Sequence, residues 1–250
     1  MPDRALVLVH DPAADRRERI PGALIPALSA RDIKHDVMSF VAGNEPEPEL
    51  DAYDLLVVMG SKESAYDDAV PWLGPEIAFV GAAVERGLPV LGICFGAQLL
   101  ARHLGGTARP AVRAEFGFTA VGSDDPELVP RGPWMQFHSD SFVPPAGTEI
   151  ARNAAGSQAF ASGKTLGVQF HPEVTADSFD AWLERWAAGG ETPTRAPAAG
   201  VAALRSAVAR HERDGVLLCD RLVGAFWARA LNDWQSRRRV LRHKRPRPNR

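Results

Sequence analysis

Residues 89–105 read PVLGICFGAQLLARHLG, and the fold of the chain is decided by this stretch. Residues 89–93 are short and apolar, which predicts a buried strand, whereas residues 96–104 take the apolar spacing of a helix. Cys94 stands at the junction, flanked by Gly92 and Gly96, where a sharp turn leaves no room for a Cβ. The pattern predicts a nucleophile elbow with its thiol at a helix N-terminus, where thiolate is favoured. The alternative for an isolated motif is a buried core cysteine beside an ordinary turn.

Two further features favour the reactive cysteine. Gln98 completes a G-x-C-x-G-x-Q pattern around the elbow. Residues 167–173 read GVQFHPE, which predicts a strand that ends at His171, with Glu173 two residues later. A histidine base and a carboxylate that orients it are what a cysteine nucleophile requires.

The two motifs together, GICFGAQ and GVQFHPE, resemble those of the class I (triad-type) glutamine amidotransferases. The resemblance covers about residues 1–187 and is strongest to stand-alone chains that are similar to the amidotransferase domain of GMP synthase. It implies a flavodoxin-like α/β fold, in which helices flank a mostly parallel central sheet. The implied amidotransferase domain spans residues 1–188.

The resemblance also implies roles for individual residues. Cys94 is the expected nucleophile, His171 the proton-transfer group and Glu173 its orienting partner. The N–H groups of Gly60 and Phe95 are expected to form an oxyanion hole. The family has a Gly-Gly-Pro-type loop at this position, whereas this chain has Met59 before Gly60 and Ser61 after it.

Substrate contacts are implied at two places. Gln98 resembles a side chain that contacts bound glutamine. His138-Ser139-Asp140 resembles a His-Gly-Asp loop whose N–H groups bind the α-carboxylate, although Ser139 replaces the usual glycine. The position of His138 in that motif predicts a structural role rather than that of the catalytic base.

The remaining elements alternate between strands and helices, as in βαβ units with a parallel sheet. Strands are expected at residues 4–10, 35–41, 55–59, 149–153, 159–162 and 166–170, and paired strands at 106–121. Helices are expected at residues 16–30 with interruptions, 75–86, and 175–187 with Thr175 or Asp177 as its cap. Apolar side chains at Phe179, Trp182, Leu183 and Trp186 predict a core-facing stripe on the last of these helices.

The C-terminal part lies outside the resemblance. Residues 189–200 have the Gly and Pro content of a linker, and residues 201–235 predict a helical extension of two helices, 201–211 and 216–231. Residues 236–250 predict a disordered basic tail, with eight Lys/Arg and no acid. We expect the domain to fold without the extension, which would dock on the domain or on a partner.

Composition excludes several classes of protein. The 250 residues are 45% hydrophobic and 24% charged, with no apolar run of membrane-spanning length. Two cysteines fit a reducing cytoplasm better than a disulfide framework. Outside residues 236–250 the chain holds 21 basic and 31 acidic side chains, which gives no reason to expect nucleic-acid binding. No Cys/His spacing indicates a metal, and no cofactor is expected.

The resemblance implies hydrolysis of glutamine to glutamate and ammonia, with a separate synthetase subunit as the acceptor because the chain has no P-loop signature. A second hypothesis is a γ-glutamyl peptidase, since the same thioester chemistry cleaves γ-glutamyl amides. A third is a non-catalytic regulatory subunit on the same fold. The acceptor, the choice between glutamine and other γ-glutamyl substrates, and the oligomeric state are not determined by the sequence.

Overall fold

The computed structural model describes residues 3–43, 46–190 and 198–243. Within them, eight strands form one sheet in the order β2-β1-β3-β4-β10-β9-β8-β6. The bounds in that order are Lys34–Met38, Arg4–Leu8, Leu55–Val58, Val90–Ile93, Thr165–Val168, Gly156–Ser162, Glu149–Asn153 and Gly122–Ser123. The first five strands run parallel to their neighbours, and the last three pair antiparallel. This arrangement confirms the predicted fold class.

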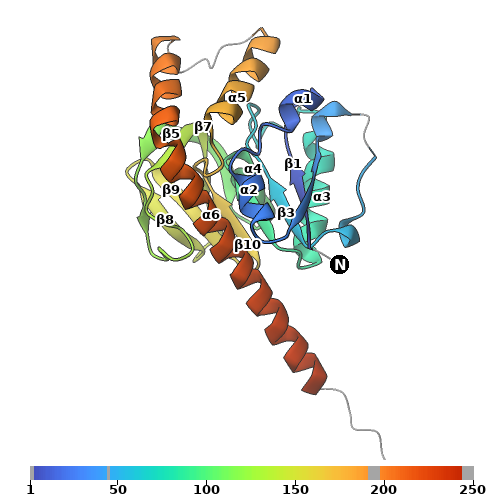
Figure 1. The fold of residues 1–250 in the computed structure, drawn as a ribbon. Helices are drawn as coiled ribbons and strands as arrows, with labels where there is room; N and C mark the ends of the chain where they lie inside the picture. Colours follow the sequence, from blue (N-terminus) through green and yellow to red (C-terminus); the bar gives the residue numbers. More distant parts are fainter. Residues whose placement is uncertain (1–2, 44–45, 191–197, 244–250) are drawn as a thin grey trace, which may run out of the picture.

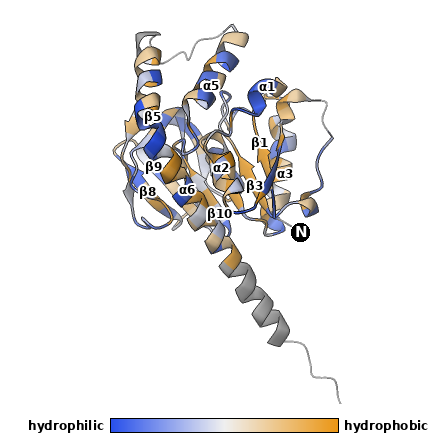
Figure 2. Ribbon diagram, in the orientation of Figure 1, coloured by the Kyte–Doolittle hydropathy of each residue, from blue (hydrophilic) through white to orange (hydrophobic). Residues whose placement is uncertain are grey.

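Helices cover both faces of the parallel part of the sheet (Figure 1). They are α1 (Ala14–Arg17), α2 (Leu24–Ser29), α3 (Leu73–Glu85), α4 (Phe95–His103), α5 (Ala176–Ala188) and α6 (Ala198–His243), with short 3-10 helices at Phe40–Ala42 and Leu50–Ala52. Strands β3, β4 and β10 are buried along their whole length because both of their faces are covered. Figure 2 shows the apolar strands between the helical layers.

Alternate residues of β1 enter two separate cores. Val7 packs with side chains from α2 and α6 on one face, whereas Leu6 and Leu8 pack with α3 and α4 on the other. The period of two follows from the alternation of side chains along a strand. Cys94 belongs to the first of these clusters and Phe95, the next residue, to the second.

The prediction that residues 106–121 contain two strands paired with each other is wrong in detail. Residues 107–119 form one strand, β5 (Thr107–Thr119), whose antiparallel partner is β7 (Trp134–Val143). The register shifts between Pro110 and Glu115, where the pairing is interrupted. Ser139 and Asp140 therefore lie within a strand, not in the loop that the family resemblance implied.

The prediction of two helices in the extension is also wrong, because residues 198–243 form the single helix α6. Gly215 does not end the helix, because a glycine inside a helix is only about 1 kcal/mol less favourable than an alanine. In Figure 1, α6 crosses the body, and its last turns extend beyond it. The predicted tail begins inside this helix, since α6 includes residues 236–243, and residues 244–250 lie outside the described part.

Helix α6 is packed into the main core. It contributes Cys219, Leu222, Val223, Phe226 and Trp227 to the cluster that contains Val7, and Leu204 and Val208 to a smaller one under α5. The guanidinium of Arg31, which follows α2, donates to the Asp220 side chain at 2.5 Å and to its backbone carbonyl at 2.8 Å. The extension therefore docks on the domain itself.

Among residues 3–43, 46–190 and 198–243, no helix combines the length and the hydropathy that crossing a bilayer requires.

Candidate active site

The elbow geometry at Cys94 follows from close backbone packing on both sides of it. Cys94 lies between β4 and α4 with φ 52° and ψ −106°, a conformation that is rare for a residue with a side chain. A Cβ at Gly96 would lie 2.1 Å from the carbonyl oxygen of Val58, and one at Gly92 would lie 2.5 Å from Leu100 Cδ1. The Cys94 N–H donates to the Val168 carbonyl at 2.8 Å. The strained turn is therefore held by the strands on either side.

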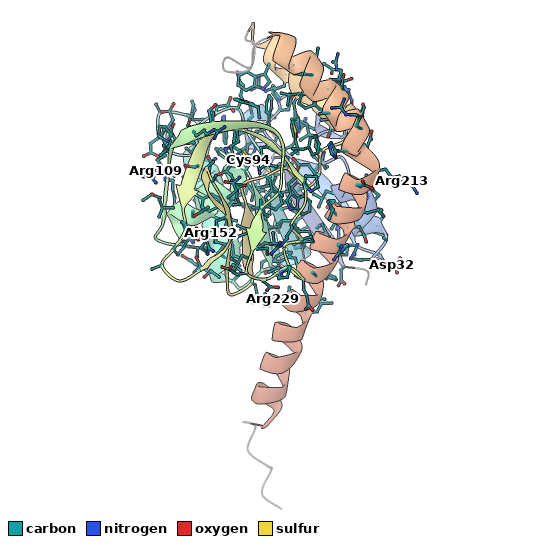
Figure 3. The ribbon with its side chains drawn as sticks, turned by 90° about the vertical axis from the view of Figure 1, so that its left-hand side faces the viewer. Asp32, Cys94, Arg109, Arg152, Arg213 and Arg229 are labelled. Atoms are coloured by element: carbon teal, nitrogen blue, oxygen red, sulfur yellow. The ribbon has the colours of Figure 1, made fainter. Side chains whose placement is uncertain are left out.

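Strand β10 delivers His171 to the same place. The His171 N–H donates to the Met135 carbonyl at 2.8 Å, so the backbone is fixed by β7. Its Nδ1 lies 2.9 Å from Glu173 Oε1, and its Nε2 is buried without a hydrogen-bond partner among the described residues. His171 and Cys94 line one cavity. Figure 3 labels Cys94 among the side chains in the middle of the domain.

The charged form of His171 is favoured. Burial alone opposes the imidazolium, but the carboxylate of Glu173 and the Cys94 sulfur outweigh it and raise the pKa of His171 to about 10. Glu173 is itself 1% exposed, and its backbone carbonyl accepts from the Ala23 N–H at 2.8 Å. The start of α2 therefore packs against the chain at Glu173 and fixes the carboxylate that faces His171.

Gly60 and Phe95 lie beside the thiol. A Cβ at Gly60 would lie 3.7 Å from Cys94 Cβ, so the glycine backbone borders the cysteine side chain. Phe95 is the first residue of α4, where an N–H has no intrahelical acceptor. Both residues line the cavity. The structure thus brings together Cys94, His171, Glu173 and the two expected N–H donors.

The cavity has a volume of about 300 Å³, and Gln98, Ser139 and Asp140 line it as well. Gln98 Nε2 donates to Gln169 Oε1 at 3.4 Å, and Gln169 Nε2 lies 3.6 Å from Cys94 Sγ. The Asp140 carboxylate accepts from Ser64 Oγ at 2.6 Å and from the Tyr66 hydroxyl at 3.0 Å. The loop after β3 is thereby tied to β7 across the cavity.

Both ring nitrogens of His138 are occupied. Nε2 lies 3.0 Å from Gln136 Oε1 and Nδ1 lies 3.0 Å from the Asp140 carbonyl. Glu115, the residue paired with it across β5 and β7, lies 3.4 Å from Nε2. Burial opposes the charge on Glu115, but His138 and neighbouring amides lower the pKa of this carboxyl below its usual value. His138 is held within a polar network, as expected of a structural residue.

Sequence reasoning missed part of the cavity wall. Trp182 packs against the core as predicted, but Trp182 and Trp186 also line the cavity, and the Trp182 ring centroid lies 4.6 Å from that of His171. Thr175 caps α5 as predicted, with Ser178 completing a reciprocal capping box. His10 and Arg185 also line the cavity, and only their neighbours in space, not their sequence context, could have indicated this.

The fold and the cavity define a cysteine-centred enzyme of the α/β class, with a thiol at an elbow and a His–carboxylate pair beside it. The family model described as glutamine amidotransferase class-I matches residues 15–187. The chain belongs to this family.

Curated proteins with a similar sequence include GMP synthases that are described as glutamine-hydrolyzing. The Synechococcus sp. protein is 36% identical over 129 residues, which are 48% of this chain and 23% of that protein. The Nostoc punctiforme protein is 31% identical over 183 residues, which are 69% of this chain and 32% of that protein. The chain thus spans about a quarter to a third of the length of these curated relatives.

Solved structures support the fold. A glutamine amidotransferase from Thermotoga maritima has a TM-score of 0.75 at 24% identity, with 90% of this chain and 98% of that one covered. A glutamine amidotransferase from Methylobacillus flagellatus has a TM-score of 0.74 at 21% identity, with 92% and 95% covered. At these identities the likeness concerns the fold alone.

Proposed function

We propose that the chain hydrolyses the side-chain amide of glutamine through a thioester at Cys94 and releases glutamate and ammonia. The observation that carries the proposal is the arrangement at His171: Nδ1 is held by Glu173, Nε2 has no hydrogen-bond partner among the residues that the structure describes, and the side chain lines the same cavity as Cys94. Nucleophile, proton carrier and orienting group are then in the order that thioester chemistry needs.

The reaction proceeds in two halves. The Cys94 thiolate attacks the amide carbon, and the N–H groups of Gly60 and Phe95 stabilise the oxyanion, usually the largest electrostatic contribution. The C–N bond breaks as His171 gives its proton to the nitrogen, so that ammonia leaves and a γ-glutamyl thioester remains. His171 then takes a proton from water, hydroxide attacks the thioester, and the thiolate departs from glutamate.

The charges around the cavity fit an α-amino acid. Lys62 and Arg185 supply positive charge at its wall, and Glu63 and Asp140 supply negative charge. A zwitterionic head group needs one of each sign. The ammonia acceptor in our proposal lies on a separate synthetase, which is supported by the GMP synthase names of relatives more than three times as long as the matched region.

The test is the release of ammonia and glutamate from glutamine, measured together for the wild-type chain and for Cys94→Ala. The wild-type chain is expected to release both in equal amounts, and the variant neither. A wild-type chain that binds glutamine without releasing ammonia would instead support the non-catalytic subunit.

A second candidate function is the hydrolysis of γ-glutamyl amides with an aromatic amine, and the wall beside His171 favours it. The leaving nitrogen must lie next to His171, and Phe116, Phe137, Trp182 and Trp186 line the same cavity. Aromatic walls bind apolar leaving groups, whereas ammonia is small and polar and gains nothing from such a wall.

The comparison of γ-glutamyl anilide with glutamine separates the two candidates. If the anilide is a substrate held by this wall, Trp182→Ala lowers its kcat/KM about tenfold more than that of glutamine. Leu183→Ala, which alters the adjacent, partly buried side chain of the same helix, is the matched control. An equal loss for both substrates in Trp182→Ala would contradict a leaving-group site at the indole.

A further inference from the structure

A second buried histidine–carboxylate pair lies beside the site, and its histidine, His10, lines the same cavity. His10, two residues after β1, has its side chain 1% exposed, and Glu76, in the first turn of α3, is fully buried. His10 Nε2 lies 2.8 Å from Glu76 Oε1, and His10 Nδ1 lies 2.9 Å from the carbonyl oxygen of Gly60. This pair therefore holds the peptide that follows the expected oxyanion donor.

The position of the proton on His10 follows from its partners. The Gly60 carbonyl can only accept, so Nδ1 must carry a hydrogen. Nε2 then either donates to an ionised Glu76 or accepts from a protonated one. In both states the pair has no net charge and the bond to Gly60 persists. Burial opposes the imidazolium, but Glu76 outweighs it and raises the pKa of His10.

The His10 ring also contacts the residue that supplies the other donor. Its centroid lies 4.7 Å from that of Phe95 in an edge-on arrangement, and 5.0 Å from that of Trp72. His171 also lies against Gly60, since its Cε1 would lie 3.0 Å from a Cβ at the glycine. Two histidines therefore border Gly60, and one of them shares the cavity with Cys94.

We propose that His10 and Glu76 are positioning residues that fix the backbone N–H groups of Gly60 and Phe95 where the tetrahedral oxyanion forms. The inference rests on the proposed function only in that the reaction passes through such an oxyanion at Cys94. A purely structural role does not explain a carboxylate at this buried position. Glu76 Oε2 has no hydrogen-bond partner among the described residues, and an apolar side chain of equal volume is often as stabilising as a buried ion pair.

The test compares two reactions of the same thiol. Acylation of Cys94 by p-nitrophenyl acetate passes through a tetrahedral oxyanion and releases p-nitrophenolate. Alkylation by iodoacetamide displaces iodide at a tetrahedral carbon and forms no oxyanion. The ratio of the acylation rate to the alkylation rate therefore reports the placement of the donors, whereas changes in thiolate content or access move both rates. Each rate is corrected with Cys94→Ala.

Three variants separate the contacts. His10→Gln places its amide near Nε2 and loses the donor to Gly60, so the ratio is expected to fall 10- to 100-fold, less than complete loss of a donor. His10→Asn places its amide near Nδ1 and should retain a larger ratio. Glu76→Gln donates to Nε2 and keeps Nδ1–H, so the ratio should stay within about threefold of wild type. His211→Gln, at a histidine that stacks on Phe118 outside the cavity, is the control.

An unchanged ratio in His10→Gln, or a ratio in His10→Asn no higher than in His10→Gln, would overturn the proposal. If His10→Gln does not fold, as judged by its thermal melt, Glu76→Leu replaces it, and an unchanged ratio there has the same consequence. A wild-type chain that releases no ammonia from glutamine contradicts the proposed function alone, because the two thiol reactions still report on the pair.

Discussion

Gly60 lies directly against the imidazole of His171: a Cβ on the glycine would lie 3.0 Å from His171 Cε1, so the ring would have to shift by a few tenths of an ångström to admit it. The loop after β3 and the residue after β10 thus meet at the thiol. Because the contact involves the imidazole itself, a methyl group at position 60 would displace the group that carries the proton.

Gly60→Ala is therefore expected to lower kcat for glutamine by about 10- to 100-fold with little loss of stability, since the imidazole can shift but then misses its partner. Gly74→Ala is the matched control, because a Cβ at Gly74 meets nothing within 4 Å and alanine favours the helix. Steady-state kinetics and thermal melts of both variants decide. A Gly60→Ala variant with wild-type kcat would show that the imidazole position is not critical.

Cys94 is expected to be the one cysteine that a glutamine-derived electrophile labels. Its side chain lines the cavity, whereas Cys219 is fully buried in α6, and burial raises the pKa of the Cys219 thiol well above its usual value. Mass spectrometry of the labelled peptides is the measurement. Labelling of Cys219 alone, or turnover of glutamine by Cys94→Ala, would show that Cys94 is not the nucleophile.

His171→Ala is expected to lower kcat by about 10³-fold or more, because the thioester can neither form nor break efficiently without a proton carrier. His138→Ala should cost less, since His138 holds Gln136 and the Asp140 carbonyl instead of facing the thiol. Single-turnover release of ammonia measures both variants. A larger loss in His138→Ala would mean that the base is assigned to the wrong histidine.

Glu173→Gln is expected to move the alkaline limb of the kcat/KM profile to lower pH. The Glu173 carboxylate is the largest contribution that raises the pKa of His171 to about 10, so its loss lets the imidazolium deprotonate earlier. The loss in kcat should be smaller than in His171→Ala, because no proton-transfer step is removed.

The same shift affects stability with a definite sign. A raised histidine pKa stabilises the folded chain fully below pH 6.5, and this contribution is lost as the pH rises through about 10. The free energies of unfolding of wild type and Glu173→Gln should therefore differ most at and below about pH 6.5 and converge as the pH rises above about 10. An alkaline limb that did not move would mean that Glu173 does not control the charge on His171.

Phe226→Ala is expected to destabilise the chain by about 3–5 kcal/mol, the usual cost of deleting a buried aromatic ring. Phe226 is 4% exposed in the core cluster shared with β1 and α2. Leu217→Ala, at a residue of the same helix that is 60% exposed, should change stability by less than about 0.5 kcal/mol. Denaturant unfolding measures both free energies, and similar values would show that α6 is not part of the folding unit.

The sequence predicted those parts of the site that depend on local chemistry. The elbow was readable because close backbone approach at Gly92 and Gly96 leaves only glycine as a possibility. Strands of the parallel sheet were readable because burial on both faces requires continuous apolar runs.

What the sequence did not reveal depends on contacts between distant segments. His10 and Glu76 are 66 residues apart, and nothing in the neighbourhood of either indicates the other. The apolar stripes of α6 were visible, but whether they cover this domain or a partner is decided by the shape of the surface left open beside α2. The spacing of Trp182 predicted its contact with the core but not its second contact, with His171 at the cavity, because that depends on how α5 packs against the residue after β10.

The position of α6 in the chain has a consequence for biosynthesis. A nascent polypeptide emerging from the ribosome already contains Cys94, His171 and Glu173 while the segment that completes one side of its core is still unmade. The apolar face of α2 and the sheet stays open until residues 204–230 follow. Chaperone binding to that face is therefore expected to last until α6 has been translated, and a chain released before that point should be degraded rather than accumulate as an active fragment.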